Sequence, residues 1–415
     1  MTQKIFIIAP HYPPSALPPS QRVRMIVPYC LENGYEPTVF TVSPKHREET
    51  EDEWMLQLLG KGCPVVEVGC LSQTWTRKIG IGDLGLRMLP FLFFALWQHA
   101  RKEKPAFMLY PVPPWFILVI APIIKWLTGV PYGIDFIDPW VHKTKTYTTY
   151  KHKLTQEIAK TLEGWVVRNA SVIYAVSKPI NDDIIERHGS MGAKPFFAIP
   201  YGVEASDFDS LKNTNTKNEV LTLRYIGAVW VTAYLVLDTL MAAFARLNAN
   251  YKFRVEFIGT SYAIGSLAQT QLTPFIEKNK LESVVFESAD RRPYKDAVRL
   301  TVSADMLFLF GDISTQYAAS KLMGLVASAK PFFAFLHRES HPYRFLKSLD
   351  YPYLVGYTTE IGDTPADNLS CLIETLTILF NKYQNFVSLD LSNPLIQEHT
   401  AANMTRRFLE PISKI

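Results

Sequence analysis

Short apolar runs alternate with helical stretches along the first half of the chain. Residues 4–9 are apolar up to Pro10, as a buried parallel strand would be. Apolar positions at helical spacing follow over residues 23–33 and stop at Gly34. Further strands are expected at residues 38–42, 65–68, 107–110, 132–136 and 172–175. This repeated strand–helix order predicts a parallel, doubly wound sheet.

A second series of the same kind follows the polar stretch 209–219, which reads as a linker or a domain boundary. Strands are expected at residues 221–226, 254–258, 284–286, 306–310 and 331–335, and helices at about 235–248, 294–303 and 320–328. The chain, at 415 residues, is too long for one ordinary core. We therefore predict two Rossmann-like α/β domains, 1–205 and 206–385, facing a cleft. In the segment 386–415, a helix at 399–409 is expected to cross back to the first domain.

The composition, 48% hydrophobic and 20% charged, is that of a packed globular protein. Four cysteines form no disulfide framework, and Cys63 and Cys70 lack a second pair at zinc-ligand spacing. Buried thiols in a reducing compartment are the expected state. The first apolar run is too short for a signal peptide, so we predict a cytoplasmic location.

The net charge of +4 is unevenly distributed: residues 1–205 carry 22 Lys and Arg against 18 Asp and Glu, and the remainder carries 21 of each. A basic first half suits an anionic membrane surface or a phosphate-bearing substrate, although so small a surplus also arises by chance.

Two apolar stretches, 84–97 and 115–130, fall short of the roughly 18–20 uninterrupted apolar residues of a spanning helix. We expect two buried helices. The alternative is that residues 84–104 lie on the inner face of a membrane as a peripheral contact.

In a doubly wound sheet, ligands bind beyond the carboxyl ends of the strands, so the loops there are the candidate sites. The loop after the first strand holds His11 and Ser15, and Ser20 is placed to cap the next helix, with Arg22 and Arg24 in its first turn. A helix N-terminus beside guanidinium groups predicts an acceptor or phosphate site. A rigid surface turn with solvated arginines is the alternative.

A strand at 132–136 leads into a second polar loop. Asp135 lies within the strand and is expected to bond backbone or a loop. Asp138 ends the strand, where it could accept a proton from an acceptor hydroxyl or orient a sugar, and His142 could do the same. Capping of the turn before Pro139 by Asp138 is an equal alternative.

In the second half, the strand at 306–310 runs into Asp312 and Tyr317, and Ser320 and Lys321 open the predicted helix. The helix dipole, its free N–H groups and the lysine charge predict a diphosphate site. Gly227, at the end of the strand 221–226, permits close approach of backbone to a ligand.

At these points the sequence resembles glycosyltransferase family 4 and its relatives of GT-B fold, over nearly the whole chain. The resemblance lies in Gln21-Arg22-Val23-Arg24, in Asp135-Phe136-Ile137-Asp138-Pro139-Trp140, and in Ile199-Pro200-Tyr201-Gly202-Val203. Ala319-Ser320-Lys321-Leu322 followed by Ala327-Ser328-Ala329-Lys330-Pro331 resembles the family's SKL and GKP stretch.

The resemblance implies a glycosyltransferase of cell-surface polysaccharide or glycolipid synthesis. Its sugar-nucleotide donor would bind the second domain and its glycan or lipid-linked acceptor the first. Transfer in the family usually retains anomeric configuration and needs no metal and no cofactor. Ser320 and Lys321 would bind the donor diphosphate, Gly227 would line the donor pocket, and Lys321 would support the leaving group.

Four departures from the family pattern accompany this resemblance. Gly324 stands where a carboxylate usually binds the donor ribose, and residues 230–233 offer no cation. Residues 16–19 replace a glycine pair. Ile137 stands in place of a histidine, for which His142 is the candidate substitute. Two alternatives therefore remain: a non-catalytic binding or scaffolding protein of polysaccharide assembly, and an enzyme that epimerises or hydrolyses a sugar nucleotide.

Overall fold

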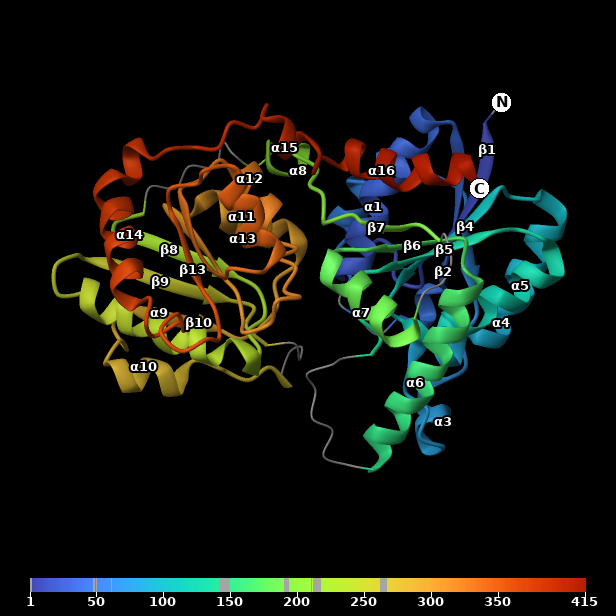
Figure 1. The fold of residues 1–415 in the computed structure, drawn as a ribbon, viewed down its shortest axis with the longest axis horizontal. Helices are drawn as coiled ribbons and strands as arrows, with labels where there is room; N and C mark the ends of the chain where they lie inside the picture. Colours follow the sequence, from blue (N-terminus) through green and yellow to red (C-terminus); the bar gives the residue numbers. More distant parts are fainter. Residues whose placement is uncertain are drawn as a thin grey trace. The chain divides into compact units, whose positions relative to one another are not determined.

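The fold is taken from a computed structural model that describes residues 2–47, 49, 51–60, 62–141, 150–189, 194–209, 211, 218–261 and 267–415. Contacts divide the chain into two compact units (Figure 1). The first unit comprises Met1–Gly202 and Ala401–Ile415, and the second comprises Val203–Thr400. The division falls three residues before the predicted boundary. The segment that returns to the first unit begins at Ala401, inside the segment 386–415 and within the helix expected at 399–409.

The described residues of the first unit form one parallel sheet in the order β3-β2-β1-β4-β5-β6-β7. Its strands are β1 (Gln3–Ile8), β2 (Tyr35–Val42), β3 (Val65–Val68), β4 (Phe107–Val112), β5 (Tyr132–Phe136), β6 (Val172–Ala175) and β7 (Phe196–Ala198). Its helices are α1 (Pro18–Cys30), α2 (Trp54–Gln57), α3 (Gln73–Lys78), α4 (Leu84–Glu103), α5 (Ala121–Thr128), α6 (Tyr150–Asn169), α7 (Lys178–His188) and α16 (Ala401–Leu409).

The second unit repeats this plan with the strand order β10-β9-β8-β11-β12-β13, again all parallel. Its strands are β8 (Leu221–Ile226), β9 (Phe253–Ile258), β10 (Val285–Ser288), β11 (Met306–Phe310), β12 (Phe332–His337) and β13 (Leu354–Tyr357). Its helices are α8 (Ser206–Asp209), α9 (Tyr234–Leu247), α10 (Thr273–Asn279), α11 (Tyr294–Ser303), α12 (Leu322–Ser328), α13 (His341–Ser348), α14 (Leu369–Lys382) and α15 (Pro394–Gln397). Two doubly wound sheets confirm the predicted fold class.

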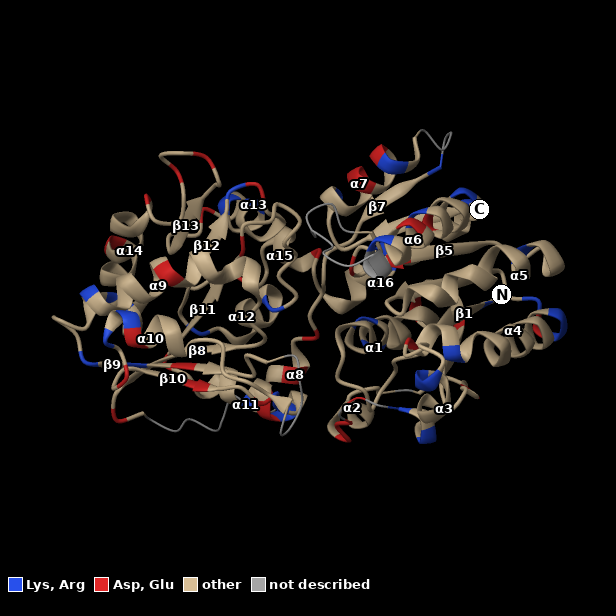
Figure 2. Ribbon diagram, turned by 90° about the horizontal axis from the view of Figure 1, so that it is seen from below, with Lys and Arg blue, Asp and Glu red and all other residues tan. Residues whose placement is uncertain are grey.

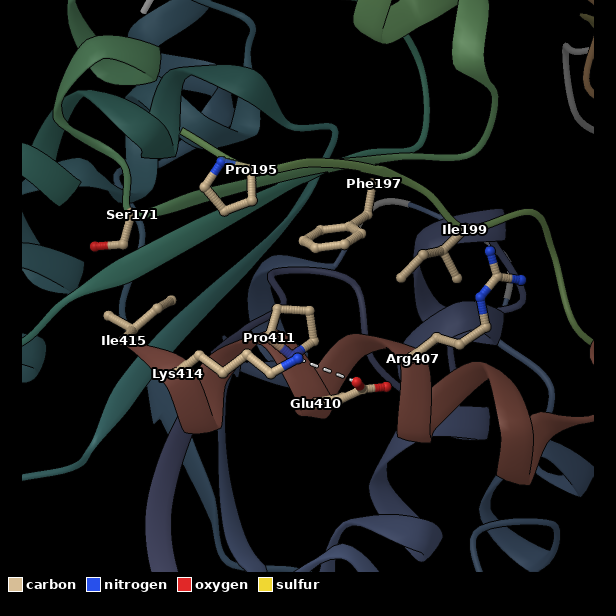
Figure 3. Close-up of a pocket in the computed structure, with 9 residues that line it drawn as sticks. All are labelled: Ser171, Pro195, Phe197, Ile199, Arg407, Glu410, Pro411, Lys414 and Ile415. Carbon is tan, nitrogen blue, oxygen red and sulfur yellow. Dashed lines mark hydrogen bonds and ion pairs between the residues drawn. The ribbon is translucent and has the colours of Figure 1, made fainter. Parts of the chain in front are cut away.

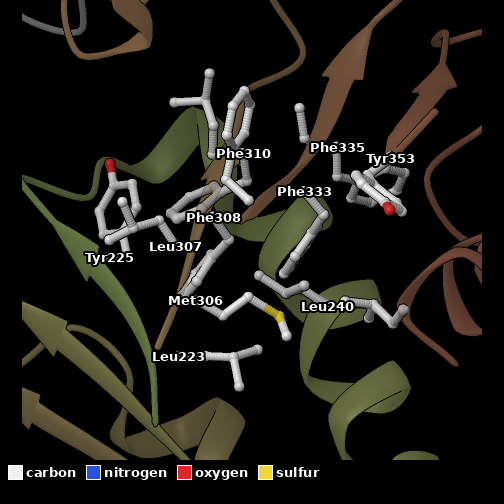
Figure 4. Packing of buried hydrophobic residues seen from close by; sticks show 14 of the residues in the cluster. Leu223, Tyr225, Leu240, Met306, Leu307, Phe308, Phe310, Phe333, Phe335 and Tyr353 are labelled. Carbon is white, nitrogen blue, oxygen red and sulfur yellow. The ribbon is translucent and has the colours of Figure 1, made fainter. Parts of the chain in front are cut away.

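The central strands of the second unit are buried on both faces, which explains their continuous apolar sequences. All five residues of β11 are buried, and Phe308 stacks on Phe333 of β12 with ring centroids 5.4 Å apart (Figure 4). Tyr225, at the end of β8, joins this cluster through a ring contact of 4.5 Å with Phe310. The core therefore fixes the end of β8, from which the candidate site begins.

The two apolar stretches of the first half form α4 and, for the second, a 3-10 turn followed by α5. The prediction that both are buried helices holds for one face only. Met88, Leu92 and Leu96 are buried, whereas Phe94 is 62% exposed and Trp126 on α5 is 82% exposed. Among the described helices, none is both long and apolar enough to span a bilayer.

Candidate functional site

Two neighbouring strands at the centre of the second sheet end in glycine-containing loops. From β8 the chain continues to β9 and β10 on one side of the sheet, and from β11 it continues to β12 and β13 on the other side. The loops after β8 and β11 therefore border the switch point, where the strand order reverses direction. Gly227 follows β8, and Gly311 and Asp312 follow β11. A switch point of this kind is where doubly wound sheets bind ligands. The predicted residues of the second half therefore converge there.

Lys321 reaches across this switch point. Its Nζ donates a hydrogen bond of 3.1 Å to the Tyr225 hydroxyl and lies 4.6 Å from the centre of the Tyr225 ring. The Tyr225 hydroxyl in turn donates to the Ala228 carbonyl at 3.0 Å. The amine lies against the backbone of Gly227, because a Cβ built at that position would be only 1.6 Å from Lys321 Nζ. Only glycine leaves room for this arrangement, and its φ of +146° also favours glycine.

Burial and a neighbouring guanidinium weaken the proton affinity of Lys321. Desolvation, together with repulsion by Arg291, lowers the pKa of Lys321 to about 7. Arg291 belongs to the loop after β10, and its Cα lies 3.6 Å from the position of a Cβ at Gly259 in the loop after β9. The ends of three strands thus place Arg291 near enough to Lys321 to lower the pKa of that amine. A dianionic ligand would relieve their repulsion.

Asp312 holds the loops around the site in place. Its Oδ2 accepts hydrogen bonds of 2.9 Å from Trp230 Nε1 and from the Thr232 hydroxyl, and its Oδ1 accepts one of 2.8 Å from the Ser314 amide. The carboxylate is buried. Asp312, predicted as a donor-binding residue, therefore acts inside the protein as the residue that ties the loop after β8 to the loop after β11.

Ser320 and Tyr317 lie beside Lys321 with different surroundings. Ser320 is exposed, and α12 begins at Leu322, two residues later than predicted. Lys321 is the N-cap residue, with no capping bond from its side chain. The Tyr317 ring is half-buried, with its centre 6.2 Å from that of Trp230. Ser320 and Lys321 thus immediately precede the first helical turn of α12.

Arg22 was predicted to bind an anion, and the structure corrects this prediction. Its guanidinium is fully buried and forms a bidentate ion pair with Asp135, at 2.6 and 3.1 Å. It also donates to the carbonyls of Ile199 at 2.6 Å and Pro200 at 3.2 Å, and it lies 4.8 Å from the Phe408 ring. Arg22 is thus a structural residue that joins α1, β5, the segment after β7 and α16. Asp135, which was expected to bond backbone or a loop, pairs with the Arg22 side chain.

The other predicted residues of the first loop are also buried or bonded to neighbouring side chains. His11 Nδ1 lies 2.8 Å from a Glu49 carboxylate oxygen. Ser15 is buried, and Arg24 is buried with its Nε donating to Gln21 at 3.1 Å. The helix begins at Pro18 after a Leu17 N-cap, so Ser20 does not cap it. Prolines at the first helical positions replace the expected capping serine.

The second predicted loop of the first unit is described only in part. The Asp138 side chain is exposed just beyond β5, and its carbonyl accepts a hydrogen bond of 3.1 Å from Trp115 Nε1. Trp140 is buried and packs edge-on against Phe116 at 5.5 Å. His142 lies outside the described residues. Asp138 is therefore placed at the carboxyl edge of the sheet, where a ligand of this unit would lie.

A family comparison matches most of the first unit. Residues 19–202 match the family described as "Glycosyl transferase 4-like domain". The match covers less than half of the whole chain. The match confirms the predicted resemblance and the predicted class of enzyme, a glycosyltransferase. A comparison with curated protein sequences finds no match.

Solved structures resemble the whole chain, including the part beyond residues 19–202. A glycosyltransferase from Rickettsia africae ESF-5 has a TM-score of 0.63 at 12% identity, covering 100% of this chain and 98% of that one. Anabaena Alr3699/HepE in complex with UDP-glucose has a TM-score of 0.62 at 14% identity, with complete coverage of both chains.

A UDP-GlcNAc 2-epimerase from Neisseria meningitidis bound to UDP-GlcNAc also matches, with a TM-score of 0.51 at 12% identity, covering 99% of this chain and 100% of that one. These likenesses establish a GT-B-type fold, which more than one reaction uses.

A hollow of about 390 Å³ lies within the first unit, beside the returning C-terminal segment (Figure 3). Its cations are engaged: Arg407 donates to the Ala198 carbonyl at 2.7 Å, and Lys414 pairs with Glu410 at 3.3 Å. No predicted site residue lines it. Its lining residues are Ser171, Pro195, Phe197, Ile199, Arg407, Glu410, Pro411, Lys414 and Ile415.

The structure adds two residues to the candidate site that the sequence did not single out, Tyr225 and Arg291. Tyr225 ends an apolar strand and is indistinguishable by pattern from a core residue. Arg291 begins an Arg-Arg-Pro run after β10, and a basic pair at the carboxyl end of a strand was the available signal. Across the described residues, no cluster of His, Cys, Asp or Glu side chains is arranged to hold a metal ion.

Proposed function

We propose that the protein transfers a sugar from a nucleotide-sugar donor, bound by the second unit, to a glycan or lipid-linked acceptor bound by the first. The observation that carries this proposal is the placement of Lys321 over Gly227 with Arg291 nearby. Two cations at a switch point fit a diphosphate better than a neutral ligand. The UDP-sugar complexes of the similar structures support the same class of donor.

The reaction separates a diphosphate from an anomeric carbon, so negative charge grows on the leaving oxygen. We propose that the protonated Lys321 stabilises this charge, with Arg291 and the amides before α12 assisting. Ser320 would donate to the diphosphate, and Gly227 and Tyr317 would line the donor site. Asp312 holds the surrounding loops.

In the first unit we propose that Asp138 receives the proton of the acceptor hydroxyl, or orients the acceptor, with His142 in the same loop. The finer features follow the family resemblance: retention of anomeric configuration, independence of metal, and a role in cell-surface polysaccharide synthesis. We also propose a cytoplasmic location with peripheral contact at the inner face of the membrane.

The direct test is a panel of nucleoside diphosphates and nucleotide sugars, measured by calorimetry on folded protein. We expect one nucleoside diphosphate to bind and its sugar to be transferred when an acceptor extract is added. Proton NMR of the product would report retention, and unchanged turnover in a chelator would support independence of metal. Altered free sugar formed without acceptor would instead identify an epimerase or hydrolase.

One observation favours the non-catalytic alternative. Gly324, where the family resemblance implies a ribose-binding carboxylate, faces Phe208 of α8, which lies 3.3 Å from the position of a Cβ at 324. Phe208 is buried. Phe208 therefore crowds a side chain at position 324, and glycine itself offers the ribose no carboxylate. Failure of every nucleotide to bind folded protein would favour a scaffolding role.

The lowered pKa of Lys321 predicts how donor binding depends on pH. The amine is charged below about pH 7 and loses its proton as the pH rises through that value. Above pH 7 a nucleoside diphosphate is fully ionised, so affinity should fall by up to about tenfold per pH unit as the amine becomes neutral. Calorimetric titrations with UDP at pH 7, 8 and 9 measure this slope.

Two variants test whether Lys321 causes the pH dependence of UDP affinity. Lys321→Gln should bind more weakly at every pH and show little further decline. Arg291→Ala removes the repulsion that lowers the pKa of Lys321, so the decline should begin at higher pH. An unchanged slope in Lys321→Gln would assign the titration to another group.

A further inference from the structure

The outward face of α4 is apolar in its middle and basic at its end. Phe91, Phe94, Gln98, Arg101 and Lys102 are all exposed and recur at intervals of three and four residues, so they form one stripe. The buried face of the helix lies opposite. Phe94 is 62% exposed and Phe91 43%. The helix thus packs with one side and presents two large rings with the other.

The neighbouring helix α5 extends this apolar surface. Ile123, Trp126 and Leu127 are exposed, and they also share one side of their helix. α4 and α5 lie side by side, and blue residues mark the end of α4 (Figure 2). We call these five residues, Phe91, Phe94, Ile123, Trp126 and Leu127, the α4–α5 face. A cluster of large apolar side chains beside one another on a surface usually marks a binding surface.

The sheet brings the basic and the aromatic residues to one edge. α4 leads into β4 and α5 leads into β5, and these strands are paired in register from Met108 and Tyr132. Both helices therefore end on the side of the sheet where β4 and β5 begin, α4 with Arg101 and Lys102 and α5 with Trp126 and Leu127 in the last turns. Arg101 lies 5.1 Å from the Trp97 ring.

The basic charge of the whole chain is concentrated in this region. Residues 73–128 carry seven Lys and Arg against two Asp and Glu, a net charge of +5, whereas the complete chain has a net charge of +4. The remaining 359 residues are thus nearly neutral. Aromatic side chains beside Lys and Arg are the combination that an anionic lipid surface binds, because rings enter the headgroup region while cations meet the phosphates.

We infer that the α4–α5 face, with Arg101, Lys102 and Lys104, docks the protein on an anionic lipid bilayer. This inference deepens the proposed function and rests on it for the lipid-linked acceptor that such docking would bring within reach. The bilayer is favoured over a protein partner because the cations collect at one edge of the rings and outnumber the acidic residues of the region. The contact is peripheral.

The test is flotation of the full chain with two kinds of vesicle, phosphatidylcholine alone and phosphatidylcholine with about one third phosphatidylglycerol. We expect binding to the anionic vesicles, with at least tenfold weaker binding to neutral ones and release by high salt. Phe94→Ser with Trp126→Ser should weaken binding at least tenfold. Lys102→Glu with Lys104→Glu should weaken it by about fivefold or more for each charge.

Matched controls lie in the second unit: Ile361→Ser removes a fully exposed apolar side chain, and Lys382→Glu reverses an exposed charge of α14. Both should bind vesicles like the parent. Absence of binding by the parent, equal binding to neutral vesicles, or full binding by the α4–α5 variants would overturn the inference. Loss of self-association in those variants, with vesicle binding intact, would assign the face to a second copy of the chain.

Donor binding separates this inference from the proposed function. The α4–α5 variants should bind UDP or the identified nucleotide as the parent does, because their substitutions lie in the other unit. Vesicle binding without any nucleotide binding would leave the docking surface intact and remove the proposed reaction. Nucleotide binding without vesicle binding would overturn the docking surface and leave the proposed reaction intact.

Discussion

Replacing Lys321 by alanine should lower kcat/KM for sugar transfer by about 100- to 1,000-fold, the usual cost of removing one preorganised group that stabilises developing charge. The amine lies over Gly227 and donates to Tyr225, so its position is fixed before a ligand arrives. Initial rates with a labelled nucleotide sugar, at pH 6.5 where the amine is mostly charged, measure the effect. Circular dichroism of the variant should match the parent.

Two further variants make the result specific to this lysine. Lys278→Ala removes a lysine of the same unit whose Nζ pairs with Asp238 on the surface at 2.7 Å, and it should leave turnover unchanged. Gly227→Ala keeps the amine but places a methyl group 1.6 Å from it, so Lys321 must move. Gly227→Ala should therefore reproduce much of the loss. Unchanged turnover in Lys321→Ala would remove the residue from the reaction.

The regular part of the fold followed from hydrophobic periodicity. Central strands such as β1 and β11 are continuous apolar runs because both faces of a parallel sheet are covered. Two edge strands, β7 and β13, were not predicted, since β7 has only three residues, none of them fully buried, and Gly356 interrupts the apolar run of β13. The exposed apolar face of α5 was not expected, whereas a surface position for residues 84–104 was given only as an alternative. Strong apolarity indicates burial, but it cannot distinguish a buried face from a surface that binds another molecule.

The residues of the candidate site were likewise predicted only in part. Lys321 and Gly227 were predicted because position after a strand and before a helix limits what they can do. The partners of Asp312 and Arg22 were not predicted, because a charged residue in a loop or in a first helical turn gives no sign of a partner distant in sequence. Asp135 is 113 residues from Arg22, and Trp230 is 82 from Asp312. Such pairs form only once the sheet order brings their elements together.

Breaking the Arg22–Asp135 pair should destabilise the first unit by about 3–5 kcal/mol, the cost of leaving one buried charge without its partner. Burial alone raises the pKa of Asp135, and the Arg22 guanidinium opposes that rise. In Arg22→Met the pKa of Asp135 should therefore rise further, and the carboxyl should become protonated. Urea unfolding, followed by fluorescence, should show an earlier first transition in Arg22→Met and in Asp135→Asn.

The double variant Arg22→Met with Asp135→Leu decides between structure and ligand binding. It removes both charges together, so it should recover much of the stability lost in either single variant. Ile199 and Pro200 would still lose their donor, so recovery should be incomplete. Arg22→Lys keeps the charge but cannot form the bidentate pair, and it should destabilise as well. If Arg22 instead bound the acceptor, Arg22→Lys would lower transfer while leaving the unfolding transition in place.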